Sequence, residues 1–161
     1  MSKETKQTVA ESTKAASATL MGEVEHALDP KKRLTIPSGW RAAMGNPEYV
    51  YVMPDRGGQC LNLLPPEEMD AMLAKLREKA LFNPALNQAA MTLGRMSEML
   101  PLDVQGRIRI CDKLLRFANL TTTVAMVGSF RMIKLWDPQR LKPAGEVDMA
   151  EFNAALDMLE N

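Results

Sequence analysis

Two short stretches of the chain have the same arrangement of charged residues, in which an arginine follows an aspartate by four positions. They are residues 29–33 (Asp-Pro-Lys-Lys-Arg) and residues 103–107 (Asp-Val-Gln-Gly-Arg). The forked guanidinium group of an arginine can bind two oxygens of a carboxylate or a phosphate, or the acceptor edge of a guanine base. An aspartate in a turn accepts hydrogen bonds from nearby backbone amides. The two stretches therefore predict charged turns with the capacity to bind an anion.

Two roles are open for Arg33 and Arg107. Each can form an ion pair with the aspartate of its own turn, Asp29 or Asp103, and hold the turn in shape. Each can also clamp a phosphate or recognise a guanine. The roles are compatible, because an aspartate can orient an arginine whose remaining donors point outward. A catalytic pair formed by the two aspartates is less favoured, since turn aspartates usually bind backbone amides.

The two turns belong to a longer internal repeat. After each turn, apolar residues alternate with others, at Leu34 and Ile36 in the first copy and at Ile108 and Ile110 in the second. Two further apolar segments follow in the same order in both copies, residues 50–52 and 61–64 in the first and residues 124–126 and 133–136 in the second. Such an ordered repeat predicts two copies of one structural unit.

Each copy is predicted to be a β-β-α-β-β unit of about 40 residues. Alternating apolar residues predict strands at 24–28, 33–36, 49–53 and 60–64 in the first copy, and at 107–110, 122–127 and 132–136 in the second. A unit this small seldom buries enough apolar surface to fold alone. We therefore expect the copies to pair as an intramolecular pseudo-dimer, in a mainly β fold with added helices (α+β).

Helices are predicted between and after the two copies. The first connecting helix opens with prolines and acidic residues at 65–68, and its apolar stripe comprises Met69, Met72, Leu73, Leu76 and Ala80. The second opens at Asn83, and the apolar residues expected to face inward are Leu86, Ala89, Ala90, Leu93, Met96 and Leu100. A last helix begins at Asp148 with a capping-box pattern, and we expect it to bury Phe152, Ala155, Leu156 and Leu159.

The chain divides into five expected segments. They are a flexible N-terminal tail (1–21), the first repeat (22–67), the connecting helices (68–95), the second repeat (96–141) and an acidic C-terminal helix (142–161). No apolar run approaches the roughly 20 residues of a membrane helix, and the N-terminus lacks the apolar region of a secretory signal. Two cysteines without a spacing pattern favour a reduced, cytoplasmic setting.

Charge is distributed unevenly, although the formal net charge is zero. Residues 29–41 carry four basic side chains against Asp29, whereas residues 146–161 carry five acidic side chains and no basic one. A balanced total can therefore conceal a basic patch on one face and an acidic tail elsewhere. Any binding to a polyanion must be local.

The Asp-x-x-x-Arg turn, the alternating strand and the short helix resemble the AbrB/SpoVT swapped-hairpin family. Two such copies separated by helices, with Cys60-Leu61-x-Leu-x-Pro after the first and an Ile133-Lys134-Leu135-Trp136-Asp137 segment after the second, resemble more narrowly the MraZ family of bacterial transcriptional regulators. The similarity covers residues 22–141. The chain departs from the family pattern at Lys32, where glycine is favoured, and at Cys111, where proline is common. Lys32 is therefore expected at a position of positive φ.

The resemblance implies a pseudo-dimer that assembles into a ring and binds short direct repeats in promoter DNA, such as that of the division and cell-wall gene cluster. In that family the loops of both halves face the DNA. Carried over to this sequence, this nominates Lys31, Lys32, Arg33, Arg107 and Arg109 as DNA-binding residues. Lysines act as point charges, so Lys31 and Lys32 are expected to contact phosphates rather than bases. The alternative is that both are ordinary solvated turn residues.

Other candidate sites carry less support. His26 is the only histidine, and no partners for a metal site or a serine–histidine relay lie near it in the sequence, while Cys60 and Cys111 are better interpreted as small core residues. The sequence thus predicts a cytoplasmic, nucleoid-associated transcriptional regulator without enzyme activity, cofactor, membrane contact or small-molecule substrate. The alternative is a ring-forming scaffold that binds a protein partner instead of DNA.

Overall fold

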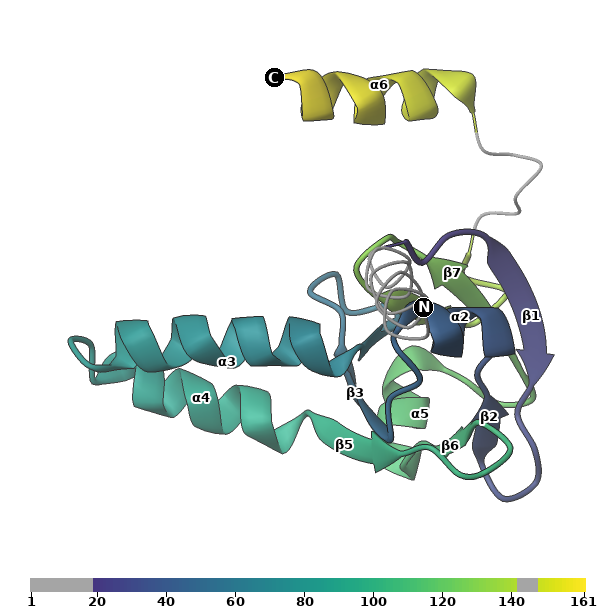
Figure 1. The fold of residues 1–161 in the computed structure, drawn as a ribbon, viewed down its shortest axis with the longest axis horizontal. Helices are drawn as coiled ribbons and strands as arrows, with labels where there is room; N and C mark the ends of the chain where they lie inside the picture. Colours follow the sequence, from purple (N-terminus) through teal and green to yellow (C-terminus); the bar gives the residue numbers. More distant parts are fainter. Residues whose placement is uncertain (1–18, 142–147) are drawn as a thin grey trace, which may run out of the picture.

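The computed structural model describes residues 19–141 and 148–161. Within these residues the protein is a mixed α+β structure (Figure 1), as the sequence predicts. The strands are β1 (Glu23–Ala27), β2 (Arg33–Thr35), β3 (Tyr49–Pro54), β4 (Leu61–Leu64), β5 (Glu98–Pro101), β6 (Arg107–Arg109), β7 (Thr123–Gly128) and β8 (Ile133–Trp136). The helices are α2 (Ser38–Ala43), α3 (Pro66–Ala80), α4 (Ala85–Arg95), α5 (Asp112–Ala118) and α6 (Met149–Glu160).

The main sheet of the described residues has six antiparallel strands in the order β1-β7-β8-β4-β3-β5. This order reads the same from either end when each strand is replaced by its equivalent in the other copy. The first strand of each copy pairs with the third strand of the other, β1 with β7 and β5 with β3, while β4 and β8 pair at the centre. Neither copy has a complete sheet by itself, because each borrows a strand from its partner copy. The expected intramolecular pseudo-dimer is confirmed.

Strands β2 and β6 form a separate two-stranded antiparallel ribbon, again with one strand from each copy. Leu34 lies opposite Ile108, and their exposed fractions are 0% and 1%. Because successive side chains of a strand point to opposite faces, the arginines that alternate with these residues lie on the other face. The ribbon therefore fixes the direction of its basic residues by burying their neighbours.

Helices α3 and α4 form an antiparallel hairpin that projects from the sheet (Figure 1). Pro66 occupies the first turn of α3, with Glu67 and Glu68 beside it at the positive end of the helix dipole. Met69 is buried against Met53 and Leu64 of the sheet. In contrast, the expectation that the apolar residues of α4 face inward is wrong, because no residue of α4 is fully buried and Leu93 is 48% exposed. The hairpin therefore leaves apolar surface uncovered.

Two further sequence expectations are wrong. Helix α4 does not continue to Leu100 but ends at Arg95, and residues 98–101 form β5. There Leu100 pairs with Val50 and is buried, so pairing at the open edge of β3 outweighs a helical periodicity that Leu100 also fits. Second, α6 has the predicted cap, because the Asp148 side chain accepts a hydrogen bond from the Ala150 amide. It nevertheless buries none of its predicted residues, Phe152, Ala155, Leu156 and Leu159.

Leu20 is the first buried residue of the part of the chain that the structure describes. Its backbone is hydrogen-bonded to that of Phe130 in both directions, and its side chain is fully buried. Leu20 thus packs although it precedes Gly22, where the sequence predicts that structure begins, and residues 1–18 of the expected tail lie outside the described residues. No helix in the described part of the chain is long and apolar enough to cross a membrane.

We predict that Leu34→Ala lowers the free energy of unfolding by roughly 3–5 kcal/mol, because it leaves a cavity under the ribbon that neighbouring residues cannot fill. Urea unfolding followed by circular dichroism measures this. Val104→Ala is the control, since Val104 is fully exposed and its change should stay within about 0.5 kcal/mol. Equal stability of the two variants would mean that the ribbon is not part of the cooperative core.

Candidate nucleic-acid interface

The first loop, residues 29–33, is closed by the carboxylate of Asp29. Its Oδ1 accepts hydrogen bonds from the backbone amides of Lys31 (2.9 Å) and Arg33 (2.8 Å), and its Oδ2 accepts one from Nε of Arg33 (2.7 Å). The Lys32 amide also donates to the Asp29 carbonyl, and the Asp29 amide donates to the Arg33 carbonyl. One carboxylate therefore sets both the backbone of the loop and the position of its arginine.

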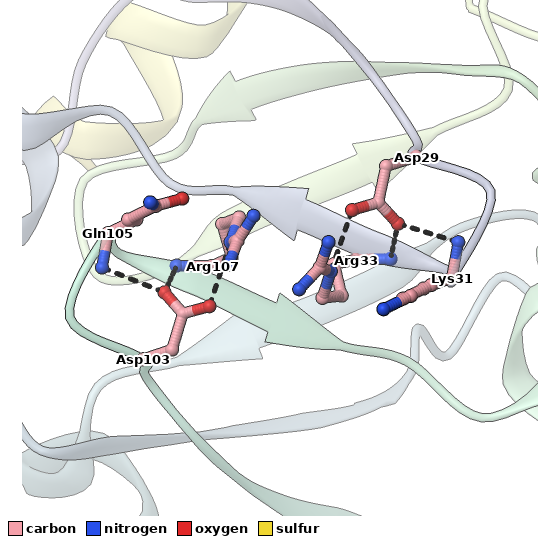
Figure 2. A network of polar contacts seen from close by, with 6 residues as sticks. All are labelled: Asp29, Lys31, Arg33, Asp103, Gln105 and Arg107. Carbon is pink, nitrogen blue, oxygen red and sulfur yellow. Dashed lines mark hydrogen bonds and ion pairs between the residues drawn. The ribbon is translucent and has the colours of Figure 1, made fainter.

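The second loop, residues 103–107, repeats this arrangement bond for bond. Oδ1 of Asp103 accepts from the amides of Gln105 and Arg107 (both 2.9 Å), and Oδ2 accepts from Nε of Arg107 (2.8 Å). Figure 2 shows the two Asp–Arg pairs at separate positions along the same ribbon. Of the two roles open from the sequence, the internal ion pair is present in both loops, and it occupies only Nε of each guanidinium.

The fourth residue of each loop has a left-handed backbone. Gly106 has a φ of 77°, and Lys32 at the equivalent position has a φ of 65°. Glycine adopts this conformation without a steric penalty, whereas a residue with a Cβ is strained there. The positive φ expected for Lys32 is confirmed. The hydrogen bonds of Asp29 hold the first loop in the same shape as the second despite the lysine.

The ribbon joins the two loops into one surface. The Ile36 amide donates to the Gly106 carbonyl (2.9 Å), and the Ile110 amide donates to the Lys32 carbonyl (3.2 Å). Across the ribbon, Arg33 lies opposite Arg109 and Thr35 opposite Arg107. The structure therefore gathers all of the nominated basic residues on one ribbon and its two loops, namely Lys31, Lys32, Arg33, Arg107 and Arg109.

The loop aspartates remain charged near neutral pH. The hydrogen bond from the Arg33 backbone amide contributes most to lowering the pKa of Asp29 below its ordinary value of 3.8. Burial opposes this effect, and the Arg33 side chain and the Lys31 amide lower the pKa further. Arg107 lowers the pKa of Asp103 in the same way. A lowered pKa in the folded state stabilises the loops above the ordinary pKa, and this contribution is lost only when the pH falls through the lowered value.

The net charge of the surface comes from residues other than the paired arginines. Asp29 and Asp103 neutralise Arg33 and Arg107. Within the part of the chain that the structure describes, Lys31, Lys32 and Arg109 have neither an ion pair nor a side-chain hydrogen bond, and all three are exposed. The second loop contributes only Arg107 and its aspartate, so the first loop is the more positive of the two.

His26, Cys60 and Cys111, which the sequence offers as weaker candidates for a metal or catalytic site, lie in a strand or in partly to fully buried positions. His26 lies within β1, opposite Val124. Cys60 is buried, and burial raises the pKa of its thiol to about 11. Burial likewise raises the pKa of Cys111. Neither thiol is therefore activated as a thiolate near neutral pH.

One residue beside the loops was not nominated from the sequence. Arg41, on α2, donates from Nε to the Ile36 carbonyl (3.0 Å), and its guanidinium lies against Gly106 of the second loop. The excess of basic residues in 29–41 is the signal that could have found it. The sequence gives no sign that Arg41 approaches the loop of the other copy, because only the pairing of β2 with β6 brings them together.

This geometry defines a class of protein: a fused pair of β-β-α-β-β units that exchange strands and present two equivalent Asp–Arg loops on a shared ribbon. No family model matches the chain. It is 31% identical over 131 residues to the transcriptional regulator MraZ of Mycolicibacterium gilvum, covering 81% of the chain and 89% of that protein. It is 30% identical over 149 residues to that of Chlorobium luteolum, covering 85% and 95%. The chain belongs to the MraZ family of transcriptional regulators.

We predict that Asp103→Ala weakens binding to a DNA duplex although it removes a negative charge from the loop. The reason is that the substitution releases two backbone amides and the Arg107 side chain. Fluorescence anisotropy with a labelled duplex measures the affinity. Asp103→Asn, which keeps one oxygen acceptor for the amides, should have a smaller effect. Tighter binding by Asp103→Ala would show that the aspartate only repels DNA and does not position the arginine.

Proposed function

We propose that the chain binds double-stranded promoter DNA through its two loops and thereby regulates transcription in the cytoplasm, associated with the nucleoid. The observation that carries this proposal is the joining of two equivalent Asp–Arg loops on one ribbon, beside which Lys31, Lys32 and Arg109 form no ion pair with any described residue. Family membership supports the regulatory role, because the matched relatives are named transcriptional regulators. The target proposed is a set of short direct repeats, as at the division and cell-wall gene cluster.

The loops suit a division of work between phosphates and bases. The aspartate bond to Nε leaves the Nη groups of Arg33 and Arg107 available as a fork for a guanine or a phosphate. Lys31 and Lys32 are exposed point charges and suit phosphates, which position a protein on DNA without reading its sequence. The more positive first loop would then supply most of the attraction to the DNA backbone.

One such surface is small, so we propose that several copies act together in a ring. Linked weak sites gain affinity when each engages one of several spaced repeats. The helical hairpin supplies a contact for this assembly. Its tip exposes Leu81 and Phe82, and a groove of about 230 Å³ between the hairpin and the sheet is lined mainly by apolar side chains that include Met72, Leu76 and Leu93.

A second copy of the chain is the occupant that we propose for this groove. The same molecule carries both a projecting apolar tip and an apolar hollow, so the tip of one copy can enter the hollow of the next. Contacts between two different surfaces of the same molecule are heterologous, and they generate closed rings when the rotation between copies closes. Burial of the exposed tip would supply the free energy of association.

A protein-binding scaffold is the second candidate. The observation that favours it is α6, which is acidic and exposes an apolar stripe containing Phe152 and Leu159, at 52% and 84% exposure. The two candidates differ in their response to salt. Binding through phosphates weakens steeply as the salt concentration rises, whereas an apolar contact between proteins does not.

We predict that Arg33→Ala and Arg107→Ala each weaken binding by roughly tenfold, because each removes a positioned guanidinium. The probe is a labelled duplex of the region upstream of the chain's own gene, and affinity is measured by gel shift at two salt concentrations. Arg77→Ala, on the exposed face of α3, is the matched control and should leave the affinity unchanged. Undiminished binding by the Arg33/Arg107 double variant would remove both residues from the DNA surface.

We predict that Phe82→Glu lowers the mass of the assembly, because it places a charge in the proposed apolar contact. Size-exclusion chromatography with light scattering measures the mass. The control is Gln88→Glu, which adds the same charge to an exposed position of α4 without removing apolar surface. If Phe82→Glu assembles like the unmodified protein, the hairpin tip is not the contact between copies.

A further inference from the structure

The two loops differ at one pair of equivalent positions. In the second loop, the residue with the left-handed backbone is Gly106, and the guanidinium of Arg41 covers it so closely that a Cβ at Gly106 would overlap Cζ and Nε of Arg41. The Arg41 side chain is anchored to the Ile36 carbonyl, and the Ile36 amide binds the Gly106 carbonyl. Arg41, Ile36 and Gly106 therefore form one connected unit.

The first loop has the reverse arrangement. Its left-handed residue is Lys32, which carries the positive charge itself. The residue equivalent to Arg41 in the second copy is Leu115 of α5, at the same offset as that between Asp29 and Asp103. Leu115 is buried, and together with Lys32 it lines a shallow surface depression. The first loop, which contains Lys32, thus lies beside Leu115 of α5. The second loop, which contains Gly106, lies beside Arg41 of α2.

Arg41 supplies a positive charge that the residues of the second loop lack. Arg107 is neutralised by Asp103, and the tip residues Val104 and Gln105 are uncharged. The only hydrogen bond of the Arg41 side chain in the described part of the molecule uses Nε, and no carboxylate there pairs with it. Its Nη groups are therefore available beside the second loop.

We propose that Arg41 is a further DNA-contacting residue, which gives the second loop the phosphate contact that Lys32 gives the first. The proposal rests on the proposed function of the loops. It also accounts for the difference between the loops, because a side chain at Gly106 would displace Arg41, whereas Leu115 leaves Lys32 in place. Arg41 thus gives the second loop one positive charge from a helix of the first copy, while the first loop, which also carries Lys31, remains the more positive of the two.

The test compares Arg41→Leu, Gly106→Lys and the double variant Arg41→Leu/Gly106→Lys, all in the full chain. The probe is the labelled duplex from upstream of the chain's own gene, with anisotropy measured over a series of potassium chloride concentrations. Arg41→Leu should weaken binding by roughly tenfold, as expected for a lost charge-assisted hydrogen bond. It should also reduce the slope of log affinity against log salt by about one. The double variant recreates the Lys32–Leu115 pair in the second loop and should recover most of the affinity and the salt slope. The single variant Gly106→Lys should not bind DNA better than the unmodified chain.

Two further variants separate the charge of Arg41 from its structural role. Arg41→Gln keeps a donor for the Ile36 carbonyl without the charge, and it should show the same loss of salt slope with an unchanged melting temperature. Arg77→Leu is the control for a lost charge elsewhere and should behave like the unmodified protein. Unchanged affinity and slope in both Arg41→Leu and Arg41→Gln would overturn the inference, while continued sensitivity to Arg33→Ala and Arg107→Ala would leave the proposed function intact. Absence of salt-sensitive DNA binding by the unmodified protein would instead overturn the proposed function.

Discussion

The fold and the site both depend on a carboxylate that binds two backbone amides and one guanidinium between the first two strands of each repeat. Asp29 and Asp103 turn the chain tightly enough for β2 and β6 to begin at the arginines four residues later. The same bonds hold an arginine at a fixed place on the turn. Because the acceptor is ionised, these hydrogen bonds are stronger than neutral ones. They also keep Lys32 in a left-handed conformation that a lysine otherwise disfavours.

Exchange of strands between the copies places the two turns at the two ends of one short ribbon. Each copy contributes one strand to the ribbon, and the alternation that buries Leu34 and Ile108 directs the arginines to the opposite face. The loops therefore share one ribbon for the same reason that the fold is stable, since neither unit can bury its apolar residues alone. A further result is that α2 of the first copy packs beside the loop of the second, which brings Arg41 to Gly106.

Much of the architecture could be predicted because the repeat preserves its order and because turn and strand signals are local. The errors occurred where a segment satisfies two patterns or lacks a partner. Leu100 fits both a helical stripe and an edge strand, and only the open edge of β3 decides between them. The stripe of α6 correctly indicates an amphipathic helix. Its burial could not be predicted from periodicity, which identifies an apolar face but not the surface that covers it.

The sequence by itself determined the two Asp–Arg turns, the pairing of two like units and the basic residues nominated for DNA, because these follow from side-chain type, spacing and repetition. Tertiary structure alone decided which charges remain uncompensated and which residues from distant segments join them. The charge on Arg33 is matched within its own loop, whereas Arg41 reaches the loop of the other copy. That contact depends on the antiparallel pairing of β2 with β6, and sequence spacing contains no record of a distance across such a pair.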